Sequence, residues 1–305
     1  MNNISDNKLV GKVQENCPCN SEFVGRMGSR LSTPIAIFWL SLPLIFLLFS
    51  ATESTMAQDF DQSHHLYDSA LKKYVENGMV SYGRFKTDTK ALDRYLYDVA
   101  AVSENKFRSW NEAQQLAFLF NLYNAATLRL ILDHYPVKSI KDIGSFLKGP
   151  WDRPVVRLLG KTITLNALEQ DILRKQYSEP RLHMALVCAA KGCPPLRSEA
   201  YTAKQLNEQL DDQARQFLRN PVKFRIDRRN GVVYLSPIFK WYGSDFHNKY
   251  SPSSGFIGLG ETQRTVMNFC ARYLPDGDRK YLEAGGYSVK FLDYDWSLNE
   301  QKEAP

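Results

Sequence analysis

The chain has 305 residues, of which 44% are apolar and 24% are charged, and its formal net charge is +6. This composition is typical of a globular protein with one large or two small domains, and it excludes extensive disorder. The basic residues form no block and no stripe interleaved with aromatic side chains, so we do not expect nucleic acid as a main partner. The sequence has no P-loop, dinucleotide-binding, G-x-S-x-G, H-E-x-x-H or EF-hand motif, which excludes several large enzyme classes.

An apolar stretch near the N-terminus, residues 35–49, indicates export. It is short for a membrane span of about 20 residues and suits the core of a signal peptide. Thr55-Met56-Ala57 places small residues where a signal peptidase would cleave, before Gln58. We therefore expect residues 1–57 to be a signal peptide or signal anchor, and residues 58–305 to be a single globular domain.

Two interpretations of residues 1–57 remain possible: a cleaved signal peptide and an uncleaved signal anchor. Translation from Met27 instead of Met1 would give a signal peptide of ordinary proportions. An uncleaved segment would instead be a transmembrane helix that anchors the domain to the outer face of the inner membrane. We expect a periplasmic or membrane-anchored protein in either case, with membrane contact only through this segment.

The first half of the domain reads as helical. Apolar periodicity predicts amphipathic helices over residues 59–77 and 87–102, the first of them ended by Asn77-Gly78. The apolar pattern of residues 110–135 predicts one long helix that is apolar on nearly every side, with Asn111 as its N-cap. A helix without a wide polar face must be surrounded by protein, so we expect it to form the core.

Two asparagines, Asn121 and Asn124, interrupt this apolar helix one turn apart, on the same face. Buried amide groups without partners cost about 1–3 kcal/mol, so other groups must meet them. The two amides could bond to a neighbouring backbone and fix the packing. Alternatively, one of them could face a pocket, where it orients an imidazole or donates to a developing oxyanion.

The second half mixes strands and helices. Turn signals predict hairpins around Gly160 and around Asn230-Gly231, while residues 182–190 are apolar and ambiguous in type. Periodicity predicts helices over residues 166–176, 202–219 and 261–273, and a strand over residues 287–296. No repeat or linker divides the region. We predict an α+β fold: a central buried helix with surrounding helices and a small, mainly antiparallel sheet.

The stretch from Arg181 to Pro195 contains one histidine and two cysteines, His183, Cys188 and Cys193. His183 and Cys188 would point apart in a strand or a helix, whereas Cys193 follows a turn and could fold back, which makes it the better nucleophile. An exported protein could equally form a Cys188–Cys193 disulfide across the turn. A metal site is the least favoured, because a fourth ligand is missing at any recognised spacing.

A carboxylate could complete such a group. In a strand over residues 287–296, Asp295 shares a face with Tyr287, Val289 and Phe291. From that face it could hold an imidazole in its productive tautomer. It could also simply cap a loop or pair with an arginine.

Five ordered segments resemble the domain-of-unknown-function family 547: FLFNLYNAATLRLIL, LNALEQDILR, PRLHMALVCAAKGCPPLR, LSPIFKWYGSDF and YDWSLN. The resemblance covers roughly residues 110–298, and this family has no established activity. It implies that ten residues occupy family motif positions: Asn121, Asn124, Glu169, Arg174, His183, Cys188, Cys193, Trp241, Asp295 and Trp296. Among them, we take Glu169, Arg174, Trp241 and Trp296 as candidate binding residues.

The order of elements is also loosely similar to that of transglutaminase-like thiol enzymes. In those enzymes the nucleophilic cysteine begins the central helix, and here no cysteine lies between residues 20 and 187. This departure argues against a direct transfer of their mechanism.

Two functions remain from the sequence. The first is a cysteine-dependent hydrolase or acyl transferase acting on a peptide or amide substrate: Cys193 attacks, His183 accepts its proton, Asp295 orients His183, and Asn121 or Asn124 stabilises the oxyanion. The alternative is a non-catalytic envelope binding module with a Cys188–Cys193 disulfide. We expect an unidentified peptide or small-molecule ligand, and neither a cofactor nor a metal.

Overall fold

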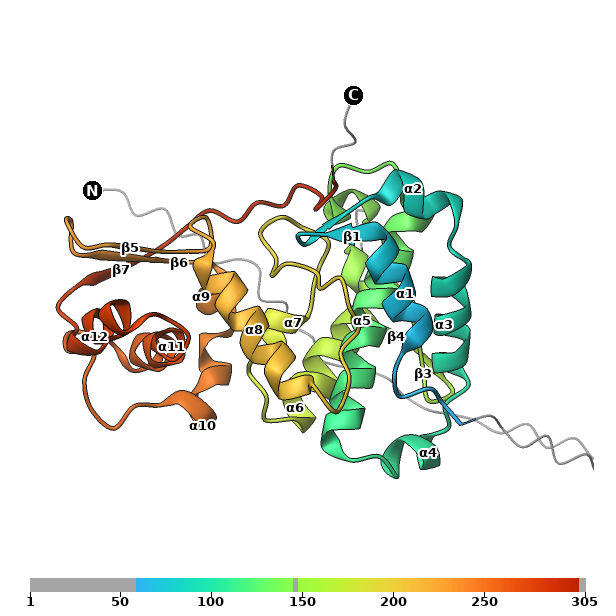
Figure 1. Ribbon diagram of the computed structural model, residues 1–305, viewed down its shortest axis with the longest axis horizontal. Coiled ribbons are helices and arrows are strands. Elements are labelled where there is room, and N and C mark those ends of the chain that lie inside the picture. The colour runs from blue at the N-terminus through green and yellow to red at the C-terminus, as the bar shows by residue number, and fades with distance from the viewer. Residues whose placement is uncertain (1–58, 145–147, 302–305) are drawn as a thin grey trace, which may run out of the picture. The chain divides into compact units, whose positions relative to one another are not determined.

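The fold is arranged around one buried helix, α5 (Glu112–His134), in a computed structural model that describes residues 59–144 and 148–301 (Figure 1). Asn111 caps it, because its side chain accepts from the Gln114 backbone while the Gln114 side chain accepts from the Asn111 backbone. Every residue from 116 to 132 is buried except Arg129. The helix is therefore the core element that its apolar composition predicts.

Four short helices that precede α5 in the sequence belong to the same hydrophobic cluster as α5. They are α1 (His65–Tyr74), α2 (Tyr82–Thr87), α3 (Lys90–Ala100) and α4 (Glu104–Arg108). Strands β1 (Val75–Glu76) and β2 (Met79–Val80) pair between α1 and α2. Asn77 and Gly78 both have positive φ, so they form a tight hairpin turn here rather than the predicted end of a longer helix.

A second hairpin packs beside α5. It consists of β3 (Pro154–Leu158) and β4 (Lys161–Thr164), which are antiparallel and joined by Leu159 and Gly160, both with positive φ. The 3-10 helices η1 (Ile140–Ile143) and η2 (Pro150–Asp152) precede it. The following segments are the π-helix η3 (Ala167–Leu173), α6 (Arg174–Gln176), α7 (Leu182–Ala185) and α8 (Leu206–Arg219).

The C-terminal half contains a three-stranded sheet of β5 (Phe224–Asp227), β6 (Val232–Leu235) and β7 (Ser288–Phe291). β5 and β6 are antiparallel, whereas β7 runs parallel to β6. Between β6 and β7 the chain forms α9 (Ile238–Tyr242), η4 (Gly243–Phe246), α10 (His247–Tyr250), α11 (Glu261–Ala271) and α12 (Asp276–Ala284). β7 is shorter than the predicted strand, and the chain after Phe291 continues without regular strand structure.

Two hydrophobic clusters hold these elements together. The larger surrounds α5 and includes α1, α3 and the β3–β4 hairpin. The smaller gathers α8, α11 and the β5–β6–β7 sheet around Phe246 and Phe269. Tyr294, in the chain after β7, packs against both clusters. The segment that carries Tyr294 therefore links the two halves of the core.

The α+β fold predicted from the sequence is confirmed, although the strands form three small sheets instead of one. Among the residues that the structure describes, no helix is both long and apolar enough to cross a membrane. The apolar stretch 35–49 and the expected cleavage site before Gln58 lie outside the described residues.

Burial of His64 makes the fold sensitive to acid. Its ring is 1% exposed, Nδ1 lies 2.9 Å from the Tyr95 hydroxyl, and Nε2 has no hydrogen-bond partner in the described part of the chain. Burial lowers the pKa of His64 from 6.5 to about 4, although the nearby Asp61 opposes the shift. As the pH falls from 6.5 towards 4, His64 therefore binds a proton in the unfolded chain but not in the folded protein, which favours unfolding.

We expect the free energy of unfolding to fall by roughly 3 kcal/mol between pH 7 and pH 4 through this residue. His64→Asn, which tolerates the positive φ of 53° at this position, should flatten this dependence in urea titrations at several pH values. His65→Asn is the matched control, because His65 is exposed. Identical pH profiles for the two variants would contradict the assignment.

Candidate functional site

A cavity of about 340 Å³ lies where the elements of the two clusters meet. It contains His183, both cysteines, Glu169 and two of the predicted binding tryptophans. Its lining residues are Tyr123, Trp151, Asn166, Glu169, His183, Leu186, Cys188, Cys193, Pro194, Ile238, Trp241, Tyr242, Tyr294 and Trp296. Six of these side chains are tryptophans or tyrosines, so the walls are predominantly aromatic.

Among the described residues of the lining, Glu169 alone contributes a carboxylate. It sits on the π-helix η3, a wide turn of a kind often found at functional sites. Its Oε2 accepts from the Tyr123 hydroxyl at 3.1 Å, and its Oε1 accepts from the Gln170 amide at 3.2 Å. Burial, and then the charge of Glu169, raise the pKa values of Tyr123 and Tyr242 well above the usual tyrosine range. Both phenols therefore remain hydrogen-bond donors at neutral pH.

His183 is held by a carboxylate on the neighbouring 3-10 helix η4. Its Nε2 lies 2.8 Å from Oδ2 of Asp245, and its ring stacks on Tyr242 with centroids 4.2 Å apart. Arg174 binds the same carboxylate with two hydrogen bonds of 2.6 and 2.7 Å. Partial burial opposes ionisation of Asp245, but the hydrogen bonds from Arg174 and His183 outweigh it and hold the pKa of Asp245 well below its usual range.

An ionised Asp245 can only accept hydrogen bonds, so Nε2 of His183 carries the hydrogen that is donated to this carboxylate. Nδ1 is left without a hydrogen-bond partner within residues 59–144 and 148–301. Arg174 does not line the cavity; it acts on the site through Asp245.

Cys188 and Cys193 form a disulfide in the cavity wall. The hydroxyl of Tyr294 lies 3.1 Å from Sγ of Cys193 and 3.3 Å from Sγ of Cys188. The ring of Tyr294 packs directly on the turn between the cysteines: a Cβ at Gly192 would come within 2.9 Å of it. Glycine is therefore required at position 192 for this close approach.

The position of Asp295 differs from the catalytic prediction. Regular strand structure ends at Phe291, so the alternation that would direct Asp295 towards the core is lost. Asp295 is exposed, and its carboxylate accepts from the backbone and the hydroxyl of Ser297. The carboxylate that orients His183 is that of Asp245, while Asp295 contributes through its carbonyl oxygen, which accepts from the Gly192 backbone.

Asn121 and Asn124 lie outside the cavity lining and hold irregular backbone instead. Asn121 donates to the Tyr201 carbonyl and accepts from the Tyr201 N–H, at 2.8 and 2.9 Å. Asn124 donates to the Ala185 carbonyl and accepts from the Val187 N–H, both at 2.9 Å. Each amide thus bonds to backbone through both its nitrogen and its oxygen, as in the packing alternative, and neither lines the cavity where an oxyanion would form.

Residues 107–218 match a family model described as "Protein of unknown function, DUF547". This segment belongs to the DUF547 family. The match confirms the family indicated by the motifs, over a shorter range than residues 110–298. No curated protein and no solved structure matches the chain, so the looser likeness to transglutaminase-like thiol enzymes remains a prediction.

The DUF547 segment supplies only part of the cavity. Glu169, His183 and both cysteines lie within it, whereas Trp241, Tyr242, Tyr294 and Trp296 lie beyond residue 218, as does Asp245. Trp241 is 46% exposed and stacks on Trp296, with centroids 6.1 Å apart. It therefore forms the rim of the cavity rather than its floor.

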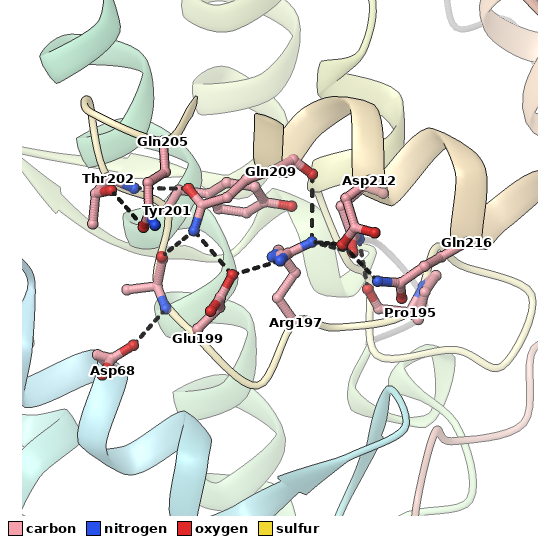
Figure 2. A network of polar contacts seen from close by, with 12 residues as sticks. Asp68, Pro195, Arg197, Glu199, Tyr201, Thr202, Gln205, Gln209, Asp212 and Gln216 are labelled. Atoms are coloured by element: carbon pink, nitrogen blue, oxygen red, sulfur yellow. Dashed lines mark hydrogen bonds and ion pairs between the residues drawn. The ribbon is translucent and has the colours of Figure 1, made fainter. Parts of the chain in front are cut away.

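Polar contacts fix the part of the DUF547 segment that follows Cys193 (Figure 2). Gln209 of α8 donates to the carbonyl of Ala200, whose N–H donates to Asp68 of α1. Arg197 donates to Asp212 at 2.6 Å. These bonds connect the irregular stretch after Cys193 to α1 and α8.

Among the aromatic and charged residues of this site, Tyr123, Trp151, Asp245 and Tyr294 were not predicted from the sequence. Three of them, Tyr123, Asp245 and Tyr294, lie in segments that carry the family resemblance, which was the available signal. Among the described residues, no group of three or more His, Cys, Asp or Glu side chains is placed to hold a metal ion.

The two hydrogen bonds between the Asn124 amide and the backbone of Ala185 and Val187 lead to a prediction about stability. Asn124→Ala would leave the buried carbonyl of Ala185 and the N–H of Val187 without partners, so we expect a loss of roughly 2–4 kcal/mol in the free energy of unfolding, measured by urea denaturation. Asn105→Ala is the control, because Asn105 is exposed on α4 and should change stability by less than about 0.5 kcal/mol. Equal stability of the two variants would refute the structural role of Asn124.

Proposed function

We propose that this protein is a non-catalytic binding module of the cell envelope, whose ligand, a small molecule or a peptide side chain, enters the aromatic cavity. The observation that carries the proposal is the Cys188–Cys193 disulfide in the cavity wall. A disulfide sulfur is not a thiolate, so neither cysteine can attack a substrate in this state. The cavity then presents aromatic rings, one carboxylate and one imidazole, which are groups that bind and orient a ligand.

The rigidity of the walls supports a binding role. His183 is fixed by Asp245 on one side and by stacking on Tyr242, and Asp245 is itself fixed by two bonds from Arg174. A preformed pocket loses little conformational entropy on binding, which favours affinity.

Export is part of the proposal. Disulfides persist in oxidising compartments and are rare in the cytosol, so the Cys188–Cys193 bridge supports the periplasmic or membrane-anchored location expected from residues 1–57. In this reading the membrane is a partner only if the N-terminal segment remains uncleaved, and nucleic acid is not a partner.

The second candidate is the thiol-dependent hydrolase or acyl transferase. It is favoured by one observation: Cys193 and His183 line the same cavity. After reduction of the bridge, Cys193 would attack a peptide or amide carbonyl and His183 would accept its proton, with Asp245 in the orienting role expected of Asp295. The Tyr294 hydroxyl, near both sulfurs, would replace Asn121 and Asn124 as an oxyanion donor.

Thiol alkylation separates the two candidates. We expect iodoacetamide to leave Cys188 and Cys193 unlabelled from pH 5 to 9 in protein purified without reductant, and to label both after dithiothreitol treatment, as read by peptide mass spectrometry. Cys270 is free but fully buried, and burial raises the pKa of its thiol far above the usual range. It should be labelled only in denaturant, which makes it the internal control.

Rapid labelling of Cys193 near neutral pH without reductant would overturn the binding module. The reduced protein and its Cys193→Ser variant would then be compared on ester and amide substrates. Turnover that depends on Cys193 would establish the hydrolase, and equal turnover by both proteins would exclude it.

A further inference from the structure

Glu169 brings a carboxylate into the cavity without an ion-pair partner among the described residues. The cavity lining, as far as the described residues form it, contains the Glu169 carboxylate and no lysine or arginine. The other acidic group nearby, Asp245, is matched by the guanidinium of Arg174 at 2.6 Å. Glu169 has no such partner: within residues 59–144 and 148–301, no cationic side chain lies within 4.0 Å of its carboxylate. Arg174 interacts with Glu169 only at longer range, so the carboxylate keeps a place for a cation in direct contact.

The surroundings of Glu169 make that charge costly to leave unmatched. The side chain is 8% exposed, and its partners, the hydroxyls of Tyr123 and Tyr242 and the Gln170 amide, are neutral. Neutral donors relieve only part of the desolvation of a buried carboxylate, whereas a cation with N–H groups would supply both charge and hydrogen bonds. Two carboxylate oxygens have about four acceptor sites, so the bonds from Tyr123, Tyr242 and Gln170 leave room for one more.

The aromatic walls favour the same kind of ligand. Trp and Tyr faces are electron-rich and attract cations placed over them. Trp296, in the cavity wall, already holds a cation over its ring: the ammonium of Lys141 lies 3.6 Å from the ring centroid. Lys141 itself is exposed and does not line the cavity. Arg174 lies 5.0 Å from the ring centroid of Tyr242 in the same way. Rings of this cluster thus accept cations within the protein itself.

We infer that the cavity binds an organic ammonium group carrying at least one N–H, which donates to Glu169 while its hydrocarbon part lies against Trp241 and Trp296. This inference rests on the proposed function, since it names the ligand class of the same cavity. An uncharged ligand of equal size would contact the same rings but leave the charge of Glu169 unmatched. The protonated amine is therefore distinguished from its neutral isosteres by charge and not by shape.

The test compares three probes of similar size on the purified protein: benzylammonium, which is charged and has N–H groups; benzyl alcohol, which is neutral; and benzyltrimethylammonium, which is charged without N–H. Three of the five tryptophans of the chain line the cavity, so tryptophan fluorescence reports occupancy. We expect millimolar binding of benzylammonium, about tenfold tighter than binding of either other probe.

Two variants locate the effect. Glu169→Gln keeps the shape and an acceptor for Tyr123 but removes the charge, and it should abolish the preference for benzylammonium. Glu208→Gln is the matched control, because Glu208 is exposed on α8 and should leave all three affinities unchanged. Thermal unfolding followed by circular dichroism verifies that each variant folds.

The outcomes separate this inference from the proposed function. Equal affinity for benzylammonium and benzyl alcohol would overturn the cationic ligand while leaving the cavity as a binding site. Binding of benzyltrimethylammonium as tight as that of benzylammonium would overturn the N–H contact to Glu169. Absence of binding by every probe would count against both the inference and the proposed function. A benzylammonium preference that Glu169→Gln removes and Glu208→Gln retains would establish the inference.

Discussion

The site depends on backbone pairing between the turn that joins the two cysteines and a segment about one hundred residues later. The N–H groups of Lys191 and Gly192 donate to the carbonyls of Ser297 and Asp295, and the N–H of Asn299 donates to the carbonyl of Ala189, at 2.8–3.0 Å. These bonds lay the C-terminal segment along the turn. They position Tyr294 and Trp296 as walls of the cavity, which neither segment could form alone.

Much of the scaffold could be predicted, because local chemistry determines it. The α5 helix has no wide polar face that could be exposed to solvent, so its burial could be predicted from its composition. The capping box of Asn111 and Gln114 allowed its first residue to be predicted. The hairpins followed from turn residues at Gly160 and Gly231, where φ is positive. Helix α12 was missed, since only Leu282 of its nine residues is buried and its sequence is predominantly polar.

The site itself was only partly predictable, for a physical reason. His183, Glu169 and the cysteines stood out by residue type and by family resemblance, but the choice of carboxylate partner depended on tertiary packing. Asp245 and Asp295 both occur in segments that carry the resemblance. The helix η4 presents Asp245 to His183, whereas the loss of strand structure after Phe291 leaves Asp295 at the surface. No periodicity within one segment could reveal that difference.

The pairing of the cysteine turn with the C-terminal segment also sets an order of assembly during synthesis. Cys188 and Cys193 are only five residues apart, so their bridge can close as soon as this turn is exposed to an oxidant. Residues 107–218 emerge from the ribosome well before Tyr294 and Trp296, and α5 lies wholly within them. The cavity therefore cannot be complete until residue 299 has been synthesised. A chain that ends before this residue would lack the aromatic side chains of Tyr294 and Trp296 or the backbone bond that positions them, and its cavity would be open on that side.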